Sequence, residues 1–441
     1  MCTAHQHTAG EVLEVLEVRW IVLVPALLGL LVAACTGPVA SSEPVTLRVV
    51  MADDWASAPL IGAAIEDFER EHEDVRVQLH GSPFSQIPEL VEAAGELDQP
   101  YDLAHWHAFA AAAAGFADPV DDLWEASGLD AEAYLPGALL DVTWDGQRVG
   151  VPLDVNALVL MANRELLAAA ELSEDELAST AGFEERVSEL AALEATDHAI
   201  TVTSSSWAAY GWIVAGGGQL LELAPDGTAA LDGQGLPSFT FDDPATVAAI
   251  ERLVALVEAG DAPPPLAVDL ALDAVAAFAD GRSALHASGS WDLPVTRRAV
   301  QTEVAVEDIA VLALPQEDPA APRTVLGGSS LFVPTEAEHR ELAFELMLAL
   351  TDLELGLALT EQEGRLPALR EAYADPMFAT SPDLAAFVEQ LEHAQVMPLI
   401  AYPEVATAFR DGLDAALSGR STPAAAMAQV QAVAERWVAE Q

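Results

Sequence analysis

The clearest pattern of apolar positions lies near the start of the chain. No charged residue stands between Trp20 and Cys35, and small residues close this run before a polar segment follows. A helix needs about 20 apolar residues to span a bilayer, so the shorter run predicts a cleaved signal peptide over residues 1–34. A signal peptide begins with basic residues, yet Arg19 stands alone among glutamates before the run, which favours a true start near Val18.

Farther along the chain, apolar residues alternate between the period of a strand and that of a helix. Ile61, Ile65 and Phe68 are four and three residues apart, which is typical of one face of a helix. The expected elements are strands over 45–51, 75–79 and 101–106 and helices over 59–72 and 87–94. Strands that alternate with helices in this way predict a parallel α/β sheet.

The pattern after residue 144 is less regular. Asp154 and Asn156 fall in a turn-rich stretch, where such residues are common, just before an expected apolar strand over 157–162. The other expected elements are a mostly helical part from Glu165 to about Gly260 and helices from Glu336 onward. Because no repeat or low-complexity linker separates the parts, the sequence favours two α/β lobes between which the chain crosses more than once.

Composition narrows the classes of function. Acidic residues number 71 against 18 bases, every base is an arginine, and the net charge is −53. The absence of lysine excludes a Walker-A phosphate loop and a Schiff-base lysine, and the charge argues against nucleic acid as a partner. Acids spread along the whole chain are typical of a solvated surface suited to high salt. Cys35 is the only cysteine after the leader, so no internal disulfide is expected.

Several stretches place aromatic or polar residues where a ligand could bind. In 278–291, a helix that ends at glycine and a short strand bring Trp291 to the carboxyl end of a strand, where open α/β sheets bind ligands. An indole face there suits the C–H-rich face of a sugar ring, and a tryptophan packed in the core is the alternative. The other stretches are the paired glycines within 324–334, the turn within 146–166, and the C-terminal segments 361–376, 394–405 and 416–427.

Together, and in this order, these stretches resemble the maltose-binding-protein-like family of extracellular sugar-binding proteins of bacterial ABC importers. The cysteine that follows Val32-Ala33-Ala34 resembles the lipobox of bacterial lipoproteins. The matching positions are Cys35, Val45–Trp55, Asp145–Pro152, Asn163–Leu166, Phe278–Trp291, Gly327–Gly328 and Gly364–Pro367. They cover nearly the whole chain after the leader, and several weak motifs in the correct order make the resemblance specific.

The resemblance implies a two-lobed α/β fold of the periplasmic-binding-protein type, with a ligand cleft between the lobes and several hinge crossings. The implied segments are a lipidated Cys35 and tether over 35–44, one lobe over 45–152 and 328–380, and a second over 153–327 and 381–441. Such a protein would capture a sugar or oligosaccharide outside the cytoplasm and deliver it to the permease subunits of an ABC transporter. It would be held at the membrane by its lipid alone, would need no cofactor, and would catalyse no reaction.

The family pattern also suggests a role for individual residues. Trp291 would stack on a sugar ring, Asp154 would accept a hydroxyl hydrogen bond, Gly328 would offer a backbone contact, and Arg365 would donate to hydroxyls or orient a carboxylate. In the first lobe, the candidates in loops after expected strands are Trp55, Asp102 and Trp106. In the second lobe, the candidates are Trp207, Tyr210 and Trp212, of which Trp207 is preferred and at least one should belong to the core.

Other functions stay open at this point. The acidic loop 52–58 could favour a cationic ligand such as a polyamine or an amino sugar, and His105 and His107 flank Trp106 in a way that suggests a metal. Two histidines do not make a zinc site without further ligands, so no metal is expected. A carbohydrate-active enzyme would need two carboxyl groups at a defined separation, for which the sequence gives no specific support. The segment 327–331 lacks the second glycine of a serine-hydrolase motif.

Overall fold

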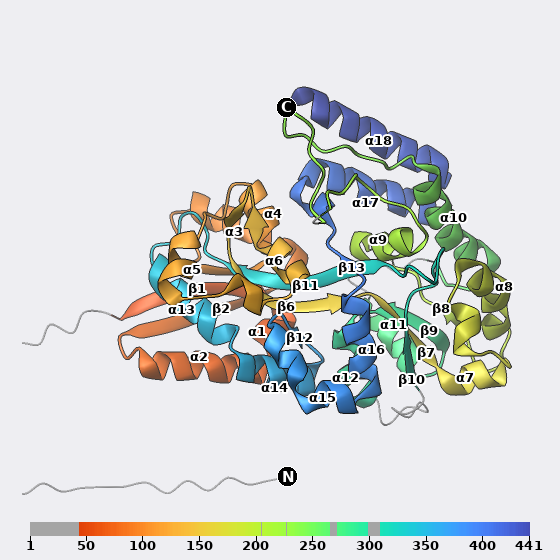
Figure 1. Cartoon of the computed structure of the whole chain (residues 1–441), viewed down its shortest axis with the longest axis horizontal. Helices are drawn as coiled ribbons and strands as arrows, with labels where there is room; N and C mark the ends of the chain where they lie inside the picture. The colour runs from red at the N-terminus through yellow and green to blue at the C-terminus, as the bar shows by residue number, and fades with distance from the viewer. Residues whose placement is uncertain (1–43, 204, 226, 265–270, 299–308) are drawn as a thin grey trace, which may run out of the picture. The chain divides into compact units, whose positions relative to one another are not determined.

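The computed structural model describes residues 44–203, 205–225, 227–264, 271–298 and 309–441. The predicted signal peptide and the lipidation site Cys35 lie outside these residues. In the described part, two larger β-sheets and their surrounding helices form the fold (Figure 1). Within the described ranges, no helix is both long and apolar enough to cross a bilayer.

The first sheet has seven strands in the order β12-β6-β11-β3-β1-β2, with β13 paired to β11. Their bounds are β1 Val45–Ala52, β2 Val75–Ser82, β3 Leu103–Trp106, β6 Val151–Ala157, β11 Thr324–Phe332, β12 Leu366–Pro367 and β13 Ala394–Gln395. β1 is parallel to β2 and β3, as the alternation of strands and helices predicts. β11 runs antiparallel to both β3 and β6, so the parallel arrangement expected from the alternation holds for β1, β2 and β3 but does not extend to β11. The reason is that β11 enters from a distant part of the chain, and a local pattern carries no information on its direction.

The second sheet has four strands in the order β10-β7-β9-β8. Their bounds are β7 Val159–Asn163, β8 His198–Ile200, β9 Ser283–Ser288 and β10 Ile309–Leu312. A single residue, Leu158, separates the last strand of one sheet from the first of the other, and the chain returns to the first sheet at Thr324. A separate hairpin joins β4 Thr143–Trp144 to β5 Gln147–Arg148. The exact lobe boundaries stay predictions from the sequence.

Helices α1 to α6 and α13 to α15 belong to the part of the chain around the first sheet. Their bounds are α1 Asp53–Ala56, α2 Pro59–Glu71, α3 Ile87–Glu96, α4 Ala108–Ala113, α5 Asp121–Ser127, α6 Pro136–Asp141, α13 Arg340–Leu350, α14 Leu353–Glu363 and α15 Pro376–Thr380. The helices expected over 59–72 and 87–94 are confirmed as α2 and α3. Ile61, Ile65 and Phe68 of α2 are buried, as their spacing predicts.

The remaining helices include the long pair α17 and α18 at the end of the chain. Their bounds are α7 Arg164–Ala169, α8 Thr180–Ala191, α9 Ser206–Ala215, α10 Pro244–Ala259, α11 Ala271–Ala279, α12 Leu293–Arg298, α16 Pro382–Leu391, α17 Pro403–Leu417 and α18 Pro423–Glu440. Between α9 and α10 the described residues form turns and isolated bridges such as Leu221 with Phe239, which interrupt the mostly helical part expected from Glu165 to about Gly260. Glycine, proline and aspartate are frequent there, which disfavours a continuous helix.

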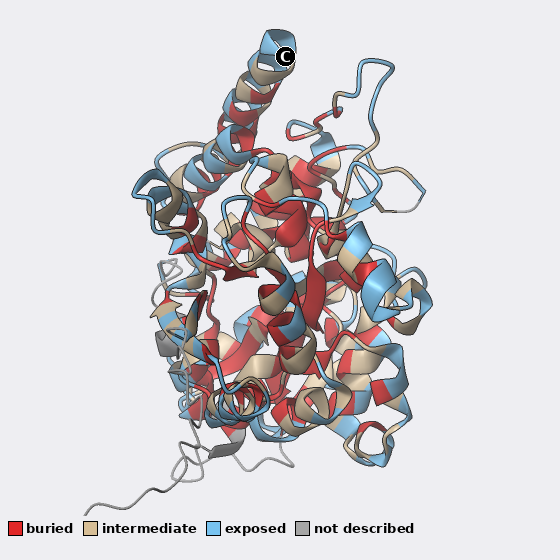
Figure 2. Cartoon of the chain, turned by 90° about the vertical axis from the view of Figure 1, so that its left-hand side faces the viewer, coloured by how far each residue is buried: buried red, intermediate tan, exposed pale blue. Residues whose placement is uncertain are grey.

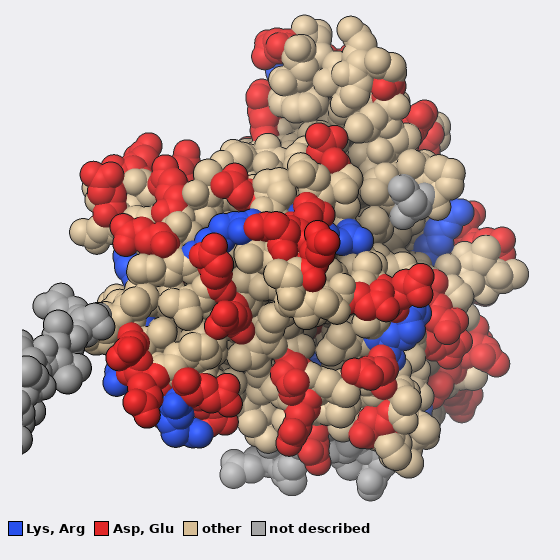
Figure 3. Space-filling model, turned by 60° about the vertical axis from the view of Figure 1, so that its left-hand side comes forward, with Lys and Arg blue, Asp and Glu red and all other residues tan. Residues whose placement is uncertain are grey.

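Two apolar cores lie under these elements. One contains Leu47, Phe332 and Phe387, and the other contains Tyr210, Phe241 and Phe409, all of them fully buried. Figure 2 shows buried residues along the strands and exposed residues on the outer faces of the helices. On the face drawn in Figure 3, acidic side chains are spread over many elements and are not gathered at one position. This distribution is what the sequence predicts for a solvated acidic surface.

Candidate functional site

Residues from four strands of the first sheet, and from helices and turns that include the turn after β9 of the second sheet, line a cavity of ≈ 340 Å³. Six of the eight predicted ligand-binding residues are among them: Trp55, Asp154, Trp207, Trp291, Gly328 and Arg365. The others are Ala52, Asp54, Phe84, His105, His107, Asn156, Gly327, Ser329 and Ile400. Residues as far apart in the sequence as Ala52 and Ile400 therefore meet around one cavity.

Strand β6 supplies two polar side chains to this cavity. The expectation that Asp154 and Asn156 lie in a turn is wrong, because both lie inside β6, where every residue is buried. They are two positions apart, so their side chains point to the same face of the strand. Local composition suggested a turn, whereas pairing with β11 on one side and β12 on the other extends the strand through both residues.

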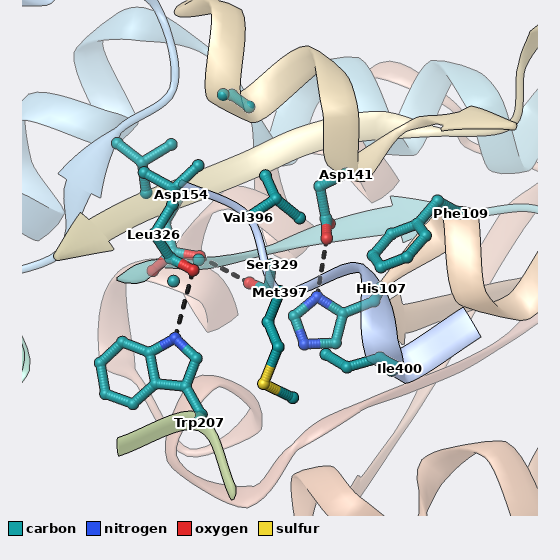
Figure 4. Close-up of a pocket in the computed structure, with 15 residues that line it drawn as sticks. His107, Phe109, Asp141, Asp154, Trp207, Leu326, Ser329, Val396, Met397 and Ile400 are labelled. Atoms are coloured by element: carbon teal, nitrogen blue, oxygen red, sulfur yellow. Dashed lines mark hydrogen bonds and ion pairs between the residues drawn. The ribbon is translucent and has the colours of Figure 1, made fainter. Parts of the chain in front are cut away.

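The paired glycines Gly327 and Gly328 also lie inside a strand, β11. A Cβ atom on Gly327 would lie 2.1 Å from Asn156 Oδ1 and 2.8 Å from Trp207 Cζ2. Trp207 can approach the strand because that Cβ is absent, and its indole Nε1 donates a hydrogen bond to the carbonyl of Leu326 at 3.2 Å. Figure 4 shows this bond and the position of Trp207 beside the strand. The absence of a Cβ at Gly327 therefore allows the side chains of Asn156 and Trp207 to pack closely against β11.

Trp291 and Trp207 form an aromatic pair at the cavity. Their ring centroids are 5.5 Å apart with an interplanar angle of 46°, and both side chains are half-buried. Trp291 lies in a short 3-10 helix, Ser290–Asp292, directly after β9, so its predicted position past the end of a strand is confirmed. The Asp292 carboxylate anchors this turn, because its Oδ2 accepts from Ser288 Oγ at 2.6 Å. The two half-buried indoles, tilted against each other, provide apolar ring faces in the lining of the cavity.

The position of Trp291 depends on the absence of a side chain at Gly289. A Cβ atom there would lie 2.0 Å from Trp291 Cζ3. We therefore expect Gly289→Ala to displace the indole, to change the tryptophan fluorescence, and to weaken any ligand that contacts the Trp291 ring by about tenfold or more. Gly233→Ala is the control, because nothing lies within 4 Å of its added Cβ. Equal fluorescence spectra in the two variants would contradict this role of Gly289.

Arg365 also lines the cavity. Its guanidinium carbon lies 4.2 Å from the ring centroid of Trp55, and its Nη2 is 2.6 Å from Asp54 Oδ2. A second carboxylate, Glu363, lies 3.5 Å from Arg365 Nε. Partial burial raises the pKa of Asp54, but the charge and hydrogen bond of Arg365 outweigh it, so the net pKa is lowered. Trp55 belongs to α1 and is buried, so it supports Arg365 from a helix and not from the expected loop.

Asp154 has an unusual environment for a carboxyl group. It is 7% exposed, and its Oδ1 accepts a hydrogen bond from Ser329 Oγ at 2.6 Å (Figure 4). Burial raises the pKa of Asp154 to about 6, although the charge of Arg365 and the bond from Ser329 act in the opposite direction. The cavity thus places a buried, titrating acceptor beside a cation and two indoles.

The two histidines around Trp106 have separate partners. His105 Nε2 lies 2.6 Å from Ser329 Oγ, whereas His107 Nδ1 lies 2.7 Å from Asp141 Oδ1. Burial lowers the pKa of His105 to about 3, so its ring is neutral. In the described part of the chain, no group of three or more histidine, cysteine or acidic residues is placed to hold a metal ion.

Two predicted site residues are not brought to the cavity. Asp102 is buried under the first sheet, where its carboxylate accepts from the backbone amides of Arg48 at 2.8 Å and His339 at 3.0 Å. It therefore ties the end of β3 to the segment before α13. Trp106 is half-buried and does not line the cavity, and its carbonyl accepts from Ser330 Oγ at 3.0 Å. The expected position in a loop after a strand is wrong for both residues, because Asp102 precedes β3 and Trp106 is its last residue.

Among the three aromatic residues of α9, the preference for Trp207 agrees with the lining of the cavity. Tyr210 belongs to the core, with 1% exposure and a hydroxyl that donates to Gln219 Oε1 at 3.0 Å. Trp212 packs against Phe183 with ring centroids 5.7 Å apart. The three aromatic residues of α9 therefore have different surroundings: Trp207 lines the cavity, Tyr210 lies in the core, and Trp212 packs against α8.

Sequence reasoning did not select Asn156, Ser329, Phe84 or Ile400 as site residues. Asn156 could have been found from Asp154 by the two-residue period of a strand, had that strand been recognised. Its Oδ1 is buried, and no donor among the described residues reaches it. Phe84 and Ile400 come from 3-10 segments, Phe84–Gln86 and Pro398–Ala401, for which the sequence carries no distinct pattern.

Comparison with known proteins gives one consistent result. A sequence profile of the family described as bacterial extracellular solute-binding protein matches residues 63–386. Among solved structures, the GacH receptor of Streptomyces glaucescens, determined unliganded and with acarbose, is 20% identical, with a TM-score of 0.76 over 90% of this chain and 100% of that one. Maltose-bound MalE3 of T. maritima is 19% identical, with a TM-score of 0.77 over 89% and 100%. UgpB from Mycobacterium tuberculosis, in complex with glycerophosphocholine, is 20% identical, with a TM-score of 0.76 over 91% and 99%.

Proposed function

The chain belongs to the bacterial extracellular solute-binding proteins, and from this premise we propose that it captures a sugar or short oligosaccharide outside the cytoplasm and delivers it to an ABC permease. Proteins of this family bind solutes for import and are not enzymes. The family profile covers most of the chain, and the solved structures that share its fold include complexes with maltose and acarbose. As parts of the same proposal, Cys35 carries a lipid anchor, and the segments 45–152 with 328–380 and 153–327 with 381–441 form two lobes that close on the ligand.

The observation that carries the sugar proposal is the pairing of an apolar surface with polar groups around one cavity. The rings of Trp207 and Trp291 suit the C–H face of a pyranose, and Asp154 and Arg365 suit its hydroxyl groups as acceptor and donor. The cavity volume of ≈ 340 Å³ lies at the lower end of the roughly 300–1,000 Å³ typical of small-molecule sites. It therefore favours a small ligand.

A cationic solute is the second candidate, favoured by the buried carboxyl of Asp154 beside the indoles and by the binding of glycerophosphocholine to UgpB. The charge balance of the site supports the neutral ligand more strongly. Asp54, the cavity-lining acid of the loop that favoured a polyamine, already pairs with Arg365. Arg365 itself would repel a second cation.

A thermal-shift screen separates the two candidates. We expect maltose or another small sugar to raise the melting temperature by several degrees, and spermidine to leave it unchanged. In Trp291→Ala the sugar-induced shift should fall below detection, since loss of stacking weakens binding about tenfold or more. Trp212→Ala is the matched control: it removes an indole that does not line the cavity, so the sugar should still raise its melting temperature. A shift with spermidine alone would overturn the sugar proposal and keep the binding site.

A further inference from the structure

A chain of hydrogen bonds with a defined direction leads from the backbone of β1 to Asp154. The amide nitrogen of Ala52 donates to His105 Nδ1 at 3.3 Å. A backbone amide can only donate, so this ring nitrogen is the acceptor. His105 is 1% exposed and its ring is neutral, so its single ring proton must lie on Nε2.

The order of donors and acceptors continues from His105 through Ser329. His105 Nε2 lies 2.6 Å from Ser329 Oγ and, as the protonated nitrogen, donates to it. The hydroxyl hydrogen of Ser329 is then free for Asp154 Oδ1, which lies 2.6 Å away. Ser329 and Asp154 are 6% and 7% exposed, so water competes little for these bonds. His105 and Ser329 thus each have one donor and one acceptor role, between the Ala52 amide, which donates, and Asp154 Oδ1, which accepts.

The second carboxyl oxygen of Asp154, Oδ2, does not take part in this hydrogen-bond chain. No donor among the described residues forms a hydrogen bond with Asp154 Oδ2, and the residue lines the cavity. We infer that His105 and Ser329 are positioning residues, which hold Asp154 as an acceptor with Oδ1 engaged and Oδ2 available to a hydroxyl group of the ligand. This inference rests on the proposed function for the identity of that ligand group, but the hydrogen-bond chain itself does not require a ligand.

The titratable groups near Asp154 shift its pKa, but the neutral His105 and Tyr373 do not change their own protonation in the same pH range. The neighbouring charges are Arg365, which stabilises the carboxylate, and Asp54 and Asp141, which oppose it. Tyr373, whose own pKa is raised by burial and by the charge of Asp154, stays protonated at neutral pH. His105 remains neutral over the same range because burial keeps its pKa near 3. Between about pH 5 and 7, Asp154 is therefore the member of the chain that gains or loses a proton.

Nitrogen NMR of the histidine rings tests the chain without any ligand. In the full-length protein labelled with ¹⁵N-histidine, the resonances absent from His105→Gln identify this ring. At pH 7 we expect the neutral tautomer with hydrogen on Nε2. The opposite tautomer, or a charged ring, would overturn the inference at once, and this measurement on the unmodified sequence does not depend on the stability of any variant.

A pH titration of the same resonances then tests the link to Asp154. We expect the His105 signals to shift with a midpoint near pH 6, to lose this step in Asp154→Asn, and to show little of it in Ser329→Ala because the connection is broken. Ser329→Thr keeps the hydroxyl and should restore the step. His198, which lies in the second sheet, is the internal reference and should be the same in all variants.

The outcomes distinguish this inference from the proposed function. A midpoint that persists in Asp154→Asn, or that is unchanged in Ser329→Ala, would show that another group titrates and that Ser329 does not link the two residues. If the NMR results hold while no sugar stabilises the protein, the positioning of Asp154 stands and the sugar proposal fails. If a sugar binds but His105 has the opposite tautomer, the sugar proposal stands and the inference fails.

Discussion

Replacing Asp154 with asparagine should make the unliganded protein more stable at pH 7 and its sugar binding weaker. The carboxyl is buried, and its pKa rises from 3.8 in the unfolded chain to about 6 in the fold. The folded state therefore binds this proton more tightly, and the associated stability is present below pH 3.8 and is lost as the pH rises through 6. A shift of about two pKa units corresponds to about 3 kcal/mol at pH 7, which the neutral amide avoids.

Urea unfolding at pH 7 and at pH 4 measures this effect. Asparagine keeps an oxygen that can accept from Ser329, so the gain at pH 7 should be about 1–3 kcal/mol. At pH 4 the aspartate of the original protein is protonated, and the difference between the two proteins should largely vanish. Taking this difference at each pH removes the contribution of the other acidic residues, which titrate in both proteins.

Asp102→Asn is the matched control, because it makes the same chemical change at another buried carboxylate. The two oxygens of Asp102 accept from the amides of Arg48 and His339, and an asparagine side chain has one oxygen to offer. One amide would then face an NH₂ group, so we expect a loss of about 1–3 kcal/mol. Destabilisation of both variants at pH 7 would contradict the special role of Asp154.

The expected change in unfolding free energy is a gain for Asp154→Asn and a loss for Asp102→Asn. We attribute this contrast to a structural role of Asp102 and a binding role of Asp154. Asp102 is buried with both oxygens satisfied, and it contributes to the fold. Asp154 has one oxygen without a donor among the described residues, and burial of its ionised carboxyl costs stability in the free protein. That cost is useful only if a ligand supplies the missing donor. A residue that lowers stability at a cavity is therefore a better candidate for binding than one that raises it.

The sequence predicted the elements that have a clear local pattern of apolar residues, and it did not predict those that depend on distant pairing or on buried polar residues. β1 was predicted from its run of apolar residues, and α2 because its apolar residues follow a helical period that matches their burial. β6 was missed at Asp154 and Asn156, since polar residues in a buried strand break the period on which the prediction depends. The direction of β11 was missed as well, because sheet neighbours more than 150 residues apart leave no local pattern. Trp291 and Arg365 were chosen from the order of weak motifs and not from a local period, and both line the cavity.

Gly328→Ala should cause the largest loss of stability among the single substitutions considered for the cavity. Gly328 has φ +123°, which L-residues rarely adopt, and an added Cβ would lie 2.3 Å from the carbonyl oxygen of Asp154 and 2.8 Å from Val155 Cα. Both contacts are with the backbone of the paired strand β6, so no side-chain rotation can relieve them. Strain and overpacking together should cost roughly 2–6 kcal/mol.

Denaturant unfolding of Gly328→Ala and Gly62→Ala measures the free energy of unfolding of both variants. The comparison shows whether a loss of stability is specific to Gly328 or follows any replacement of glycine by alanine. Gly62 lies in α2 with nothing within 4 Å of an added Cβ, so alanine there should stabilise the helix by about 0.5–1 kcal/mol. If Gly328→Ala retained full stability, β11 and β6 could not be as close at this point as their pairing requires. The close approach matters for function, because it is the pairing of Gly328 and Ser329 with β6 that places the Ser329 hydroxyl on Asp154.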